Sequence, residues 1–429
     1  MDRTTARRRW FGAGVSAVAL VLAVTACGGS DSGGGSSSGG GKTTLSMLDY
    51  YTTGGGKTAV DSYIKKFEAA HPNVTVKRQS VPFENLMPKV LQAASASDMP
   101  NIVIIDNPNV QQVAATGQLR TFDDQPGYTT QGYYPGAVKE CEFQGKHYCY
   151  PVGHNSVGLF YNKKMLDAAG VKPPTTWAEL TAAAQKLTKP PTYGMAISAP
   201  ADEQSTWQLE PFAWSSGGAM TDVSSPQWVQ ALDLWTQWAK KGYMSKSVLQ
   251  WDQSPELPAQ FLKKKAAMMI NGPWIFPLLN DAGWKYNEDY GIVTVPTQQP
   301  GQKVVAPLGG ETWTLGNSGN DTQKKLAWEF VQGTQDNSVM VQMTKEMYII
   351  PTKPAATAEF LKGGKEYEVF ATESLTARPR TIEYGASYPK VSQAVWTAIQ
   401  ASLTGTKSPQ QALSEAQQTV KTVPQQQGK

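Results

Sequence analysis

Histidine and familiar catalytic motifs are scarce in this chain. Only three histidines occur among its 429 residues, and none stands at metal-ligand spacing to another histidine or to a cysteine. After residue 41 the sequence contains no G-x-S-x-G, no H-E-x-x-H and no P-loop motif. No histidine is placed as a general base. We therefore expect no metal, no other cofactor and no enzymatic activity.

Positive charge is also limited. The formal net charge is +4, and the first 26 residues, in which four arginines oppose Asp2 alone, carry +3 of it. This leaves +1 for the rest of the chain, which shows no basic patch, so we expect no nucleic-acid partner. A chain of 429 residues is too long to fold around one compact core and is long enough for two domains.

The N-terminus has the pattern of an export signal. A basic start precedes the apolar run from Trp10 to Val24, which is too short to span a membrane comfortably. The residues that follow resemble a bacterial lipobox, with cleavage after Ala26 and a lipid on Cys27; an ordinary signal peptide with a stray cysteine is the alternative. Residues 28–41 are almost entirely Gly and Ser, which makes a flexible tether. We expect a protein anchored by lipid to the outer face of a bacterial cell membrane.

The first part of the folded chain alternates strand and helix patterns. Apolar runs and helical spacing predict a strand at 44–51, a helix at 59–70, a strand at 74–76, a helix at 83–96 and a strand at 102–105. This order favours a doubly wound α/β sheet. Ligands bind such sheets beyond the carboxyl ends of the strands. The polar residues there, Tyr51, Asp106 and Asn107, are therefore candidate ligand contacts.

The stretch 260–280 carries the same kind of signal. Ala266 to Ile270 is a short uncharged run, which predicts a strand covered on both faces, the kind found in parallel sheets. An Asn-Gly-Pro turn ends the strand, and Trp274 follows it. Trp274 is thus expected at the edge where a ligand is met. A core tryptophan that caps the next helix is the alternative.

Two cysteines lie in the folded part of the chain. Cys141 and Cys149 flank seven residues centred on Gly145, which suggests a hairpin with the two cysteines facing each other. Outside the cytoplasm they are expected to form a disulfide. Closing so small a loop stabilises the fold by about 2–3 kcal/mol through chain entropy, so we expect a structural role.

Tryptophan is abundant, with 13 in all. Trp228, Trp235 and Trp238 share one side of a predicted helix, and we expect them to pack in the core. Trp207 and Trp214 lie in loop-rich sequence before a Gly-Gly pair, where a tryptophan is better placed to face a cleft.

Four stretches of the chain resemble a known family. They are 159–180 (LFYNKKMLDAAGVKPPTTWAEL), 261–274 (FLKKKAAMMINGPW), 307–332 (PLGGETWTLGNSGNDTQKKLAWEFVQ) and 408–420 (SPQQALSEAQQTV). The four stretches follow a lipobox-like segment and occur in this order. Together they resemble the corresponding stretches of the extracellular solute-binding proteins of ABC importers. The resemblance is to the sugar-binding cluster that includes maltose-binding protein, and it covers roughly residues 44–424.

The resemblance implies an α/β fold with two lobes, each a mixed, mostly parallel sheet flanked by helices. The solute would bind between the lobes, which close on it around a hinge. We place the three hinge crossings near residues 152–155, 304–309 and 357–360. The implied division is a signal peptide at 1–26, a lipidated cysteine and linker at 27–42, an N-terminal lobe at 43–152 and 307–357, and a C-terminal lobe at 153–306 and 358–429.

The resemblance also suggests site residues. Trp274 matches the family's cleft tryptophan, and Trp207 matches an aromatic position that stacks on sugars. Asn155 falls where the family often has a sugar-contacting carboxylate. Glu311 follows a Gly-Gly crossing at which relatives present side chains to the cleft.

A sugar needs flat aromatic platforms for its C–H faces and planar polar side chains for its hydroxyls. The candidate platforms are Trp274, Trp207, Trp313 and Tyr51, and the candidate hydroxyl partners are Asp106, Asn107, Asn155 and Glu311. Arg378 and Arg380 either reach the cleft or solvate a surface loop; Arg378 is included among the candidates.

We therefore expect a monomer that captures a carbohydrate, of two or more sugar units, and delivers it to an ABC permease in the membrane. A glycerophosphodiester or a polyol is the alternative solute, and a phosphate would require arginine in the cleft. A secreted glycoside hydrolase also uses two carboxylates and aromatic platforms. A lipoprotein with a structural or adhesive role would have no closable cleft.

Overall fold

The structure, a computed structural model, describes residues 41–426. The expected signal peptide, Cys27 and nearly all of the Gly/Ser tether lie outside these residues. Among the described residues, every helix is too short or too polar to cross a membrane.

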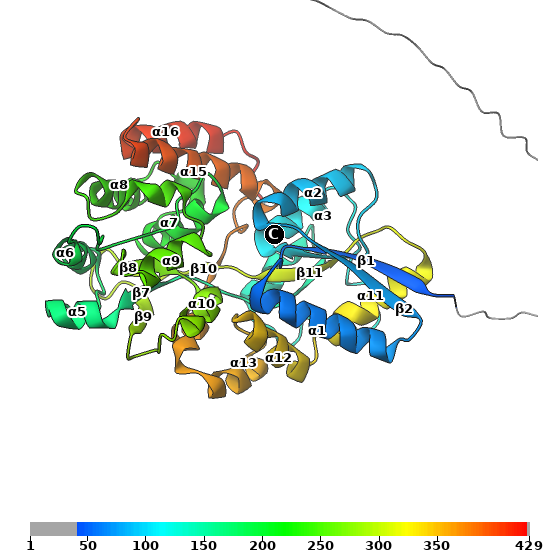
Figure 1. Cartoon of the computed structure of the whole chain (residues 1–429). Helices are drawn as coiled ribbons and strands as arrows, with labels where there is room; N and C mark the ends of the chain where they lie inside the picture. Colours follow the sequence, from blue (N-terminus) through cyan, green and yellow to red (C-terminus); the bar gives the residue numbers. More distant parts are fainter. Residues whose placement is uncertain (1–40, 427–429) are drawn as a thin grey trace, which may run out of the picture. The chain divides into compact units, whose positions relative to one another are not determined.

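Both helices and strands occur along the described chain (Figure 1). The strands are β1 Thr43–Asp49, β2 Val74–Ser80, β3 Ile102–Asp106, β4 Glu142–Phe143, β5 Lys146–His147, β6 Cys149–Pro151, β7 Gly158–Asn162, β8 Met268–Asn271, β9 Tyr290–Thr294, β10 Pro307–Leu308, β11 Glu311–Leu315 and β12 Arg378–Pro379. The α-helices are α1 Gly54–Ala70, α2 Phe83–Ser95, α3 Val110–Ala114, α4 Pro135–Glu140, α5 Lys163–Ala169, α6 Trp177–Leu187, α7 Glu203–Ser215, α8 Pro226–Lys240, α9 Glu256–Leu262, α10 Phe276–Asp281, α11 Asp321–Gly333, α12 Asn337–Met347, α13 Pro354–Phe360, α14 Glu368–Ser374, α15 Tyr388–Thr404 and α16 Pro409–Val420. Two short 3-10 turns also matter below, η1 Asn107–Asn109 and η4 Pro273–Ile275.

A five-stranded sheet has the order β2-β1-β3-β11-β6. β1 runs parallel to β2 and β3, whereas β11 runs antiparallel to β3 and β6. The predicted β-α-β-α-β order of the first three strands is confirmed. β11 comes from much later in the chain, and its first residue, Glu311, stands opposite Asp106 of β3. This register brings two distant segments to one edge of the sheet.

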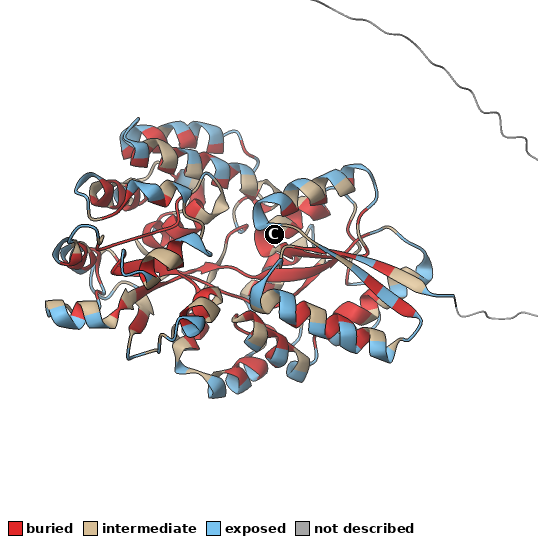
Figure 2. Ribbon diagram, in the orientation of Figure 1, coloured by how far each residue is buried: buried red, intermediate tan, exposed pale blue. Residues whose placement is uncertain are grey.

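Helices cover both faces of this sheet. Ile102 and Ile104 of β3 share a core with α1, while Val103 and Ile105 share one with α2. Successive side chains of a strand point to opposite faces, so helices on both sides bury the whole strand and account for its unbroken apolar run. Figure 2 shows buried strands inside and helices whose exposed sides face outward.

A second sheet of three strands has the order β8-β7-β9. All of β8 is buried, which confirms the prediction of a strand covered on both faces. The expected parallel pairing is only partly confirmed: β7 pairs antiparallel with both β8 and β9, whereas Ala266 and Met269 form parallel bridges with Tyr193 and Ala196. Ile270 and Met269 of β8 pack in different cores on the two faces of the sheet. An apolar run reports burial on both faces, and burial does not fix the direction of the neighbouring strand.

Three segments near the links between the sheets lie side by side. His154 forms an antiparallel bridge with Ile350, and Asn155 forms one with Gly309. The first segment connects β6 to β7, and the segment with Gly309 connects β9 to β11. The third predicted crossing, 357–360, lies within α13 instead, and the bridge is made earlier, at Ile350. The chain turns into α13 at Pro354, a residue that favours the first turn of a helix.

The predicted disulfide is confirmed. Cys141 and Cys149 are bonded, with their Cα atoms 5.1 Å apart. Between them β4 and β5 pair as an antiparallel hairpin, and Gly145 takes the positive φ of 74° that such a turn favours. The bond ties the end of α4 to β6, an edge strand of the five-stranded sheet.

The tryptophans are distributed partly as expected. Trp228, Trp235 and Trp238 are buried along α8, as predicted. Trp207 and Trp214 do not lie in a loop, since both are buried in α7. Pro211 sits inside α7, and proline in a helix interior is normally unfavourable, which explains why the sequence indicates a loop.

Candidate functional site

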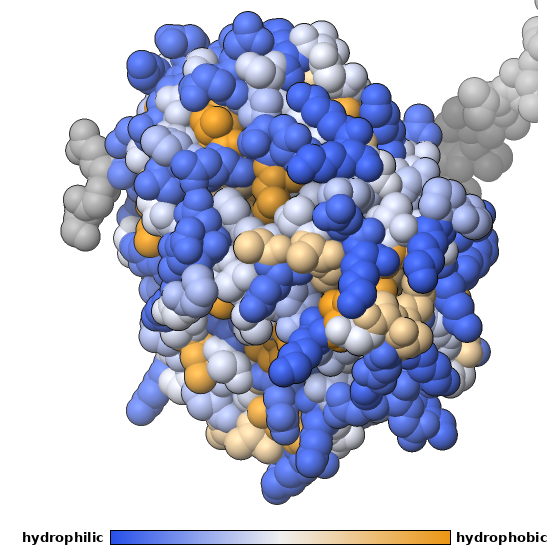
Figure 3. Space-filling view, turned by 90° about the vertical axis from the view of Figure 1, so that its left-hand side faces the viewer, coloured by the Kyte–Doolittle hydropathy of each residue, from blue (hydrophilic) through white to orange (hydrophobic). Residues whose placement is uncertain are grey.

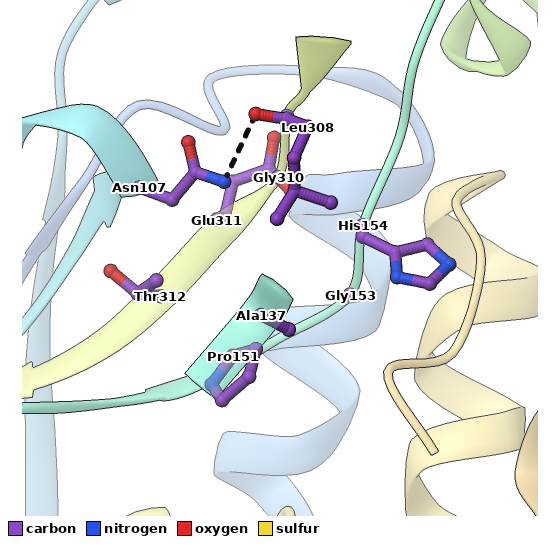
Figure 4. Close-up of a pocket in the computed structure, with 10 residues that line it drawn as sticks. Asn107, Ala137, Pro151, Gly153, His154, Leu308, Gly310, Glu311 and Thr312 are labelled. Carbon is purple, nitrogen blue, oxygen red and sulfur yellow. Dashed lines mark hydrogen bonds between the residues drawn. The ribbon is translucent and has the colours of Figure 1, made fainter. Parts of the chain in front are cut away.

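The end of β3 and the start of β11 bring three of the predicted residues together. Asp106 ends β3, Asn107 begins η1, and Glu311 stands opposite Asp106. The Asn107 peptide N–H donates to the carbonyl of Gly310 at 2.9 Å, and its side-chain Nδ2 donates to the carbonyl of Leu308 at 3.4 Å. Figure 4 shows this side-chain bond beside Glu311. We define the candidate site around these three residues.

Two glycines permit the chain to pass close to this site. A Cβ on Gly309 would lie 2.2 Å from Asn155 Oδ1 and 2.4 Å from Cη2 of Trp207. Gly310 has a φ of +134°, and a Cβ there would lie 2.3 Å from the Gly153 carbonyl oxygen. The missing side chain of Gly309 therefore lets Asn155 and Trp207 meet next to Asn107 and Glu311.

A cavity of about 10 Å³ lies among these segments, with Asn107, Glu311 and His154 among its lining residues (Figure 4). It has room for about one water molecule. His154 is buried, and its ring nitrogens have no hydrogen-bond partner among the described residues. Burial lowers the pKa of His154 to about 3, so its ring is neutral at physiological pH.

Glu311 and two tyrosines leave polar atoms without partners. The hydroxyl of Tyr50 donates to Glu311 Oε1 at 2.5 Å, and the rings of Tyr50 and Tyr51 lie 4.8 Å apart. Within residues 41–426, Glu311 Oε2 and the Tyr51 hydroxyl are buried and neither meets a partner in good hydrogen-bond geometry, although the two side chains lie close enough to shift each other's pKa. Burial, with a smaller contribution from the charge of Asp106, raises the pKa of Glu311 to about 7. These groups are suited to a partner that both donates and accepts hydrogen bonds, such as a hydroxyl.

A buried ion pair holds the backbone of Tyr51. Arg78 Nε contacts Asp49 Oδ2 at 2.6 Å, and Arg78 Nη2 donates to the Tyr51 carbonyl at 3.0 Å. The Tyr51 N–H donates to Asp49 Oδ1 at 2.9 Å. Both polar groups of the Tyr51 backbone are therefore fixed at the end of β1.

Arg380 occupies the centre of the site. Its side chain is only 3% exposed and pairs with Asp106 and with Glu203, each at 2.8 Å. It also donates to Asn107 Oδ1 at 2.7 Å and lies over the ring of Trp207, 4.6 Å from the ring centre. Asp106 ends a strand of the five-stranded sheet, Asn107 follows it in η1, and Trp207 belongs to α7.

Arg378 lies beside a different tryptophan of α7 from Arg380. It pairs with Glu383 and lies over the ring of Trp214, 4.8 Å from the ring centre. It also donates to the carbonyl of Gly218 at 3.5 Å. These groups lie toward the C-terminal end of α7, about two helical turns from Trp207, so the structure separates Arg378 from the candidate site.

Trp313 is not a platform either. It is fully buried on β11 and packs against Phe330 of α11, with ring centres 5.6 Å apart. Glu311 and Trp313 point to the same face of the strand, but only the first residue of β11 reaches the edge of the sheet. The prediction is wrong because Trp313 lies two residues farther into the sheet, under α11.

Trp274 lies in η4, directly after β8 of the three-stranded sheet. It is partly exposed and packs at the margin of both cores of that sheet. A Cβ on Gly272 would lie 1.9 Å from the Trp274 ring, so the ring folds back over the glycine. Its contact with a solute stays a prediction.

Sequence reasoning named Tyr388 only as a weaker stacking candidate and missed its partners Glu203 and Glu210. The hydroxyl of Tyr388 lies 2.8 Å from Glu203 Oε1 and 2.9 Å from Glu210 Oε1. A phenol has a single proton and donates it to one acceptor, and burial raises the pKa of Glu210 well above its usual range. The available signal was helical spacing, because Glu203, Trp207, Glu210 and Trp214 recur every three or four residues and share one face of α7.

A hollow of about 370 Å³ lies away from this site, between α6 and α8. The indole N–H groups of Trp177 and Trp238 at its wall are already bonded, to the Pro296 carbonyl and to Thr181 Oγ1. Figure 3 shows the side of the molecule on which α5 and α6 lie in Figure 1; it is mostly hydrophilic, with scattered apolar residues. We assign no ligand to this hollow.

Known proteins share this architecture. A maltotriose-binding protein of Pyrococcus abyssi is 24% identical over 307 residues, covering 68% of this chain and 62% of that protein. The crystal structure of an ABC transporter solute-binding protein from Thermotoga lettingae, bound with alpha-D-tagatose, is 25% identical with a TM-score of 0.78, covering 89% of this chain and 99% of that one. A maltose-bound protein of T. maritima, 19% identical with a TM-score of 0.79 and covering 89% and 99%, shares the fold.

The family comparison covers most of the chain. Residues 62–368 match the family described as bacterial extracellular solute-binding protein. The two sheets flanked by helices agree with the fold of the structures above. This chain belongs to the bacterial extracellular solute-binding proteins.

Proposed function

We propose that this protein is the substrate-binding component of an ABC importer and that it captures a carbohydrate. The observation that carries the proposal is the set of unpaired polar atoms at Glu311 and Tyr51, beside Asp106, Asn107 and the indole of Trp207. Sugar hydroxyls both donate and accept hydrogen bonds, and sugar C–H faces pack on aromatic rings. The sugars bound by the similar proteins support this class of solute.

The site residues come from two lobes in this proposal. The N-terminal lobe, 43–152 and 307–357, holds the five-stranded sheet, and the C-terminal lobe, 153–306 and 358–429, holds the three-stranded sheet. Each sheet has its own buried cores, which supports the division. The bridged segments at His154, Gly309 and Ile350 would serve as the hinge, and Trp274 would close on the solute from the C-terminal lobe.

A phosphate-bearing solute is less favoured by the charges of the site. Arg380 is paired with two carboxylates, and Arg378 is paired with Glu383. A phosphate requires donors that are free to bind it, and arginine is the usual residue. Both arginines have carboxylate counterions, and only Arg380 Nε is left as a buried donor without a partner on these two side chains within residues 41–426; the balanced charge supports a neutral sugar over a glycerophosphodiester.

We further propose that the protein acts without catalysis, as a monomer tethered by a lipid on Cys27 outside the cell membrane. Permease subunits in the membrane would receive the solute. The match to a family described as solute-binding proteins supports a binding role.

A thermal-shift screen tests the proposed solute class. The purified protein is heated with tagatose, maltose, maltotriose, mannobiose, sorbitol or a glycerophosphodiester. We expect a sugar to raise the melting midpoint, because a solute at 100 times its Kd stabilises the folded state by about 2.7 kcal/mol. A shift with the glycerophosphodiester alone, or with none of the sugars, contradicts the proposal.

Substitution of Trp274 tests the location of the site. Trp274→Ala is expected to weaken sugar binding by about 2 kcal/mol, as for other aromatic anchors, measured by calorimetric titration. Trp284→Ala is the matched control, because Trp284 is also partly buried at the margin of the same core. Equal affinities in the two variants would place Trp274 in the core rather than in the site.

A further inference from the structure

The guanidinium group of Arg380 joins parts of the chain that belong to different sheets. Nη2 reaches Asp106 Oδ1 and Asn107 Oδ1, at the edge of the five-stranded sheet. Nη1 reaches Glu203 Oε1 on α7, which packs on the three-stranded sheet. The flat face of the group covers Trp207, one helical turn after Glu203. The side chain of Arg380 thus touches three of the residues that are predicted to bind the solute.

The backbone of Arg380 is fixed as firmly as its side chain. Its N–H donates to Glu140 Oε1 at 2.8 Å, and the Thr381 hydroxyl donates to Glu140 Oε2 at 2.7 Å. Gln111 of α3 donates to the Thr381 hydroxyl at 3.0 Å. Upstream, β12 pairs with β10, next to Gly309. The guanidinium therefore projects from a segment that helices of the five-stranded sheet hold in place.

This arrangement sets the directions of the neighbouring groups. Arg380 takes one oxygen of Asp106 and the oxygen of Asn107, which fixes both side chains in one rotamer. It covers one face of the Trp207 indole. Only arginine has a planar fork that can pair with two carboxylates and stack on a ring at once; lysine offers a single point charge.

We infer that Arg380 is a positioning residue, which orients Asp106, Asn107 and Trp207 toward the sugar without contacting the sugar itself. The inference rests on the proposed function and extends it. Asp106 and Glu203 balance the positive charge of Arg380, although its Nε has no hydrogen-bond partner within residues 41–426. Its value to the site lies in geometry. The neighbouring Arg378 provides a built-in comparison, because it also pairs with a carboxylate and stacks on a tryptophan of α7.

The test compares Arg380→Lys with Arg378→Lys by calorimetric titration of the sugar, among tagatose, maltose, maltotriose and mannobiose, that most stabilises the wild-type protein. We expect at least about a tenfold loss of affinity for Arg380→Lys and less than about a twofold change for Arg378→Lys. Equal effects of the two substitutions overturn the inference but leave the proposed function intact. If none of the four sugars binds the wild-type protein, both are overturned.

A double-mutant cycle separates positioning from general damage to the fold. Asp106→Asn removes the charge through which Arg380 acts, so Arg380→Lys should cost much less affinity in that background than in the wild type. Equal losses in both backgrounds would mean that Arg380 only supports the fold. If Arg380→Lys does not fold, Glu203→Gln decides, because it weakens the other anchor of the guanidinium; we expect at least about a threefold loss of affinity, and unchanged affinity overturns the inference.

Discussion

Single buried carboxyl groups determine the charge of the candidate site. Asp106 has Arg380 as a counterion, whereas Glu311 forms no ion pair within residues 41–426. Its one strong partner is the neutral hydroxyl of Tyr50. Burial therefore favours the protonated form of Glu311 and raises its pKa to about 7. The group is expected to change its charge within the physiological range.

Glu311→Gln should flatten the pH dependence of folding. Wild-type Glu311 keeps its proton in the folded protein up to a pKa of about 7 but loses it near 4.5 when unfolded. Its contribution to stability is thus complete below pH 4.5 and is lost as the pH rises through 7. The glutamine does not titrate. Between pH 5 and pH 8, the free energy of unfolding measured in urea should therefore fall by up to about 3 kcal/mol more in the wild type than in the variant.

The difference between the two proteins isolates Glu311. Glu140 has a pKa raised to about 7 by burial and changes stability in the same direction, and His154 acts in the opposite direction at lower pH, but both are present in wild type and variant. The amide oxygen of the substituted side chain still offers an acceptor to the Tyr50 hydroxyl. Parallel pH profiles would show that Glu311 titrates normally.

The sequence located site residues only where a local rule applied. Asp106 and Asn107 follow from the rule that polar residues after a buried strand lie at the ligand edge. Arg378 could not be separated from Arg380 in this way, since the two stand two residues apart in the same short stretch and differ in the tryptophan and the carboxylates that they meet. Contacts with α7, which is far away in the sequence, determine where each arginine lies. A local sequence pattern carries no information about such contacts.

Whole elements were predicted better than their partners. β1, α1, β2, α2 and β3 form where apolar spacing places them, because burial on a sheet face follows directly from period and length. The apolar run of β8 did not indicate that one neighbour, β7, is antiparallel and that the other, at Tyr193 and Ala196, is parallel, because strand direction depends on where the chain turns back. α7 was missed because Pro211 outweighed an otherwise helical spacing.

The crossing element at Gly309 is expected to tolerate no side chain. Gly309→Ala would bring its Cβ within 2.2 Å of Asn155 Oδ1, so either Asn155 or Trp207 must move. Overpacking of this kind costs about 1–3 kcal/mol, which urea unfolding can measure. Sugar affinity should fall as well, since both displaced residues belong to the candidate site.

Gly363→Ala serves as its control. A Cβ on Gly363 would meet no atom closer than 3.7 Å, so we expect stability and affinity close to those of the wild type. If Gly309→Ala behaves like Gly363→Ala, the crossing segments are looser than the bridges at Asn155 and His154 indicate.

At the scale of the whole molecule, the chain divides its functions along its length. The expected export signal and lipid site occupy the first 27 residues, and both sheets lie within residues 43–315. Of the net charge of +4, +3 lies in the expected leader, so the remainder is nearly neutral. A nearly neutral receptor body is compatible with capture of an uncharged solute.

Cys27→Ser should release the protein from the membrane. Without its thiol the lipobox cannot accept a lipid, so the variant is expected in the soluble extracellular fraction, whereas the wild type sediments with membranes. Immunoblots of the fractions measure the distribution. The melting midpoint and sugar affinity of the purified variant should match the wild type, and a Cys27→Ser protein that still sediments with membranes would show another means of attachment.

The disulfide has a practical consequence for anyone who prepares this protein. Cys141 directly follows Glu140, whose carboxyl group holds the backbone of Arg380 and the hydroxyl of Thr381. Protein made in a reducing cytosol would lack the disulfide next to Glu140. The sugar titrations described above would then measure a protein in which Glu140 and Arg380 are held less firmly. Production through a secretory route, followed by a thiol count, avoids mistaking a preparative artefact for weak binding.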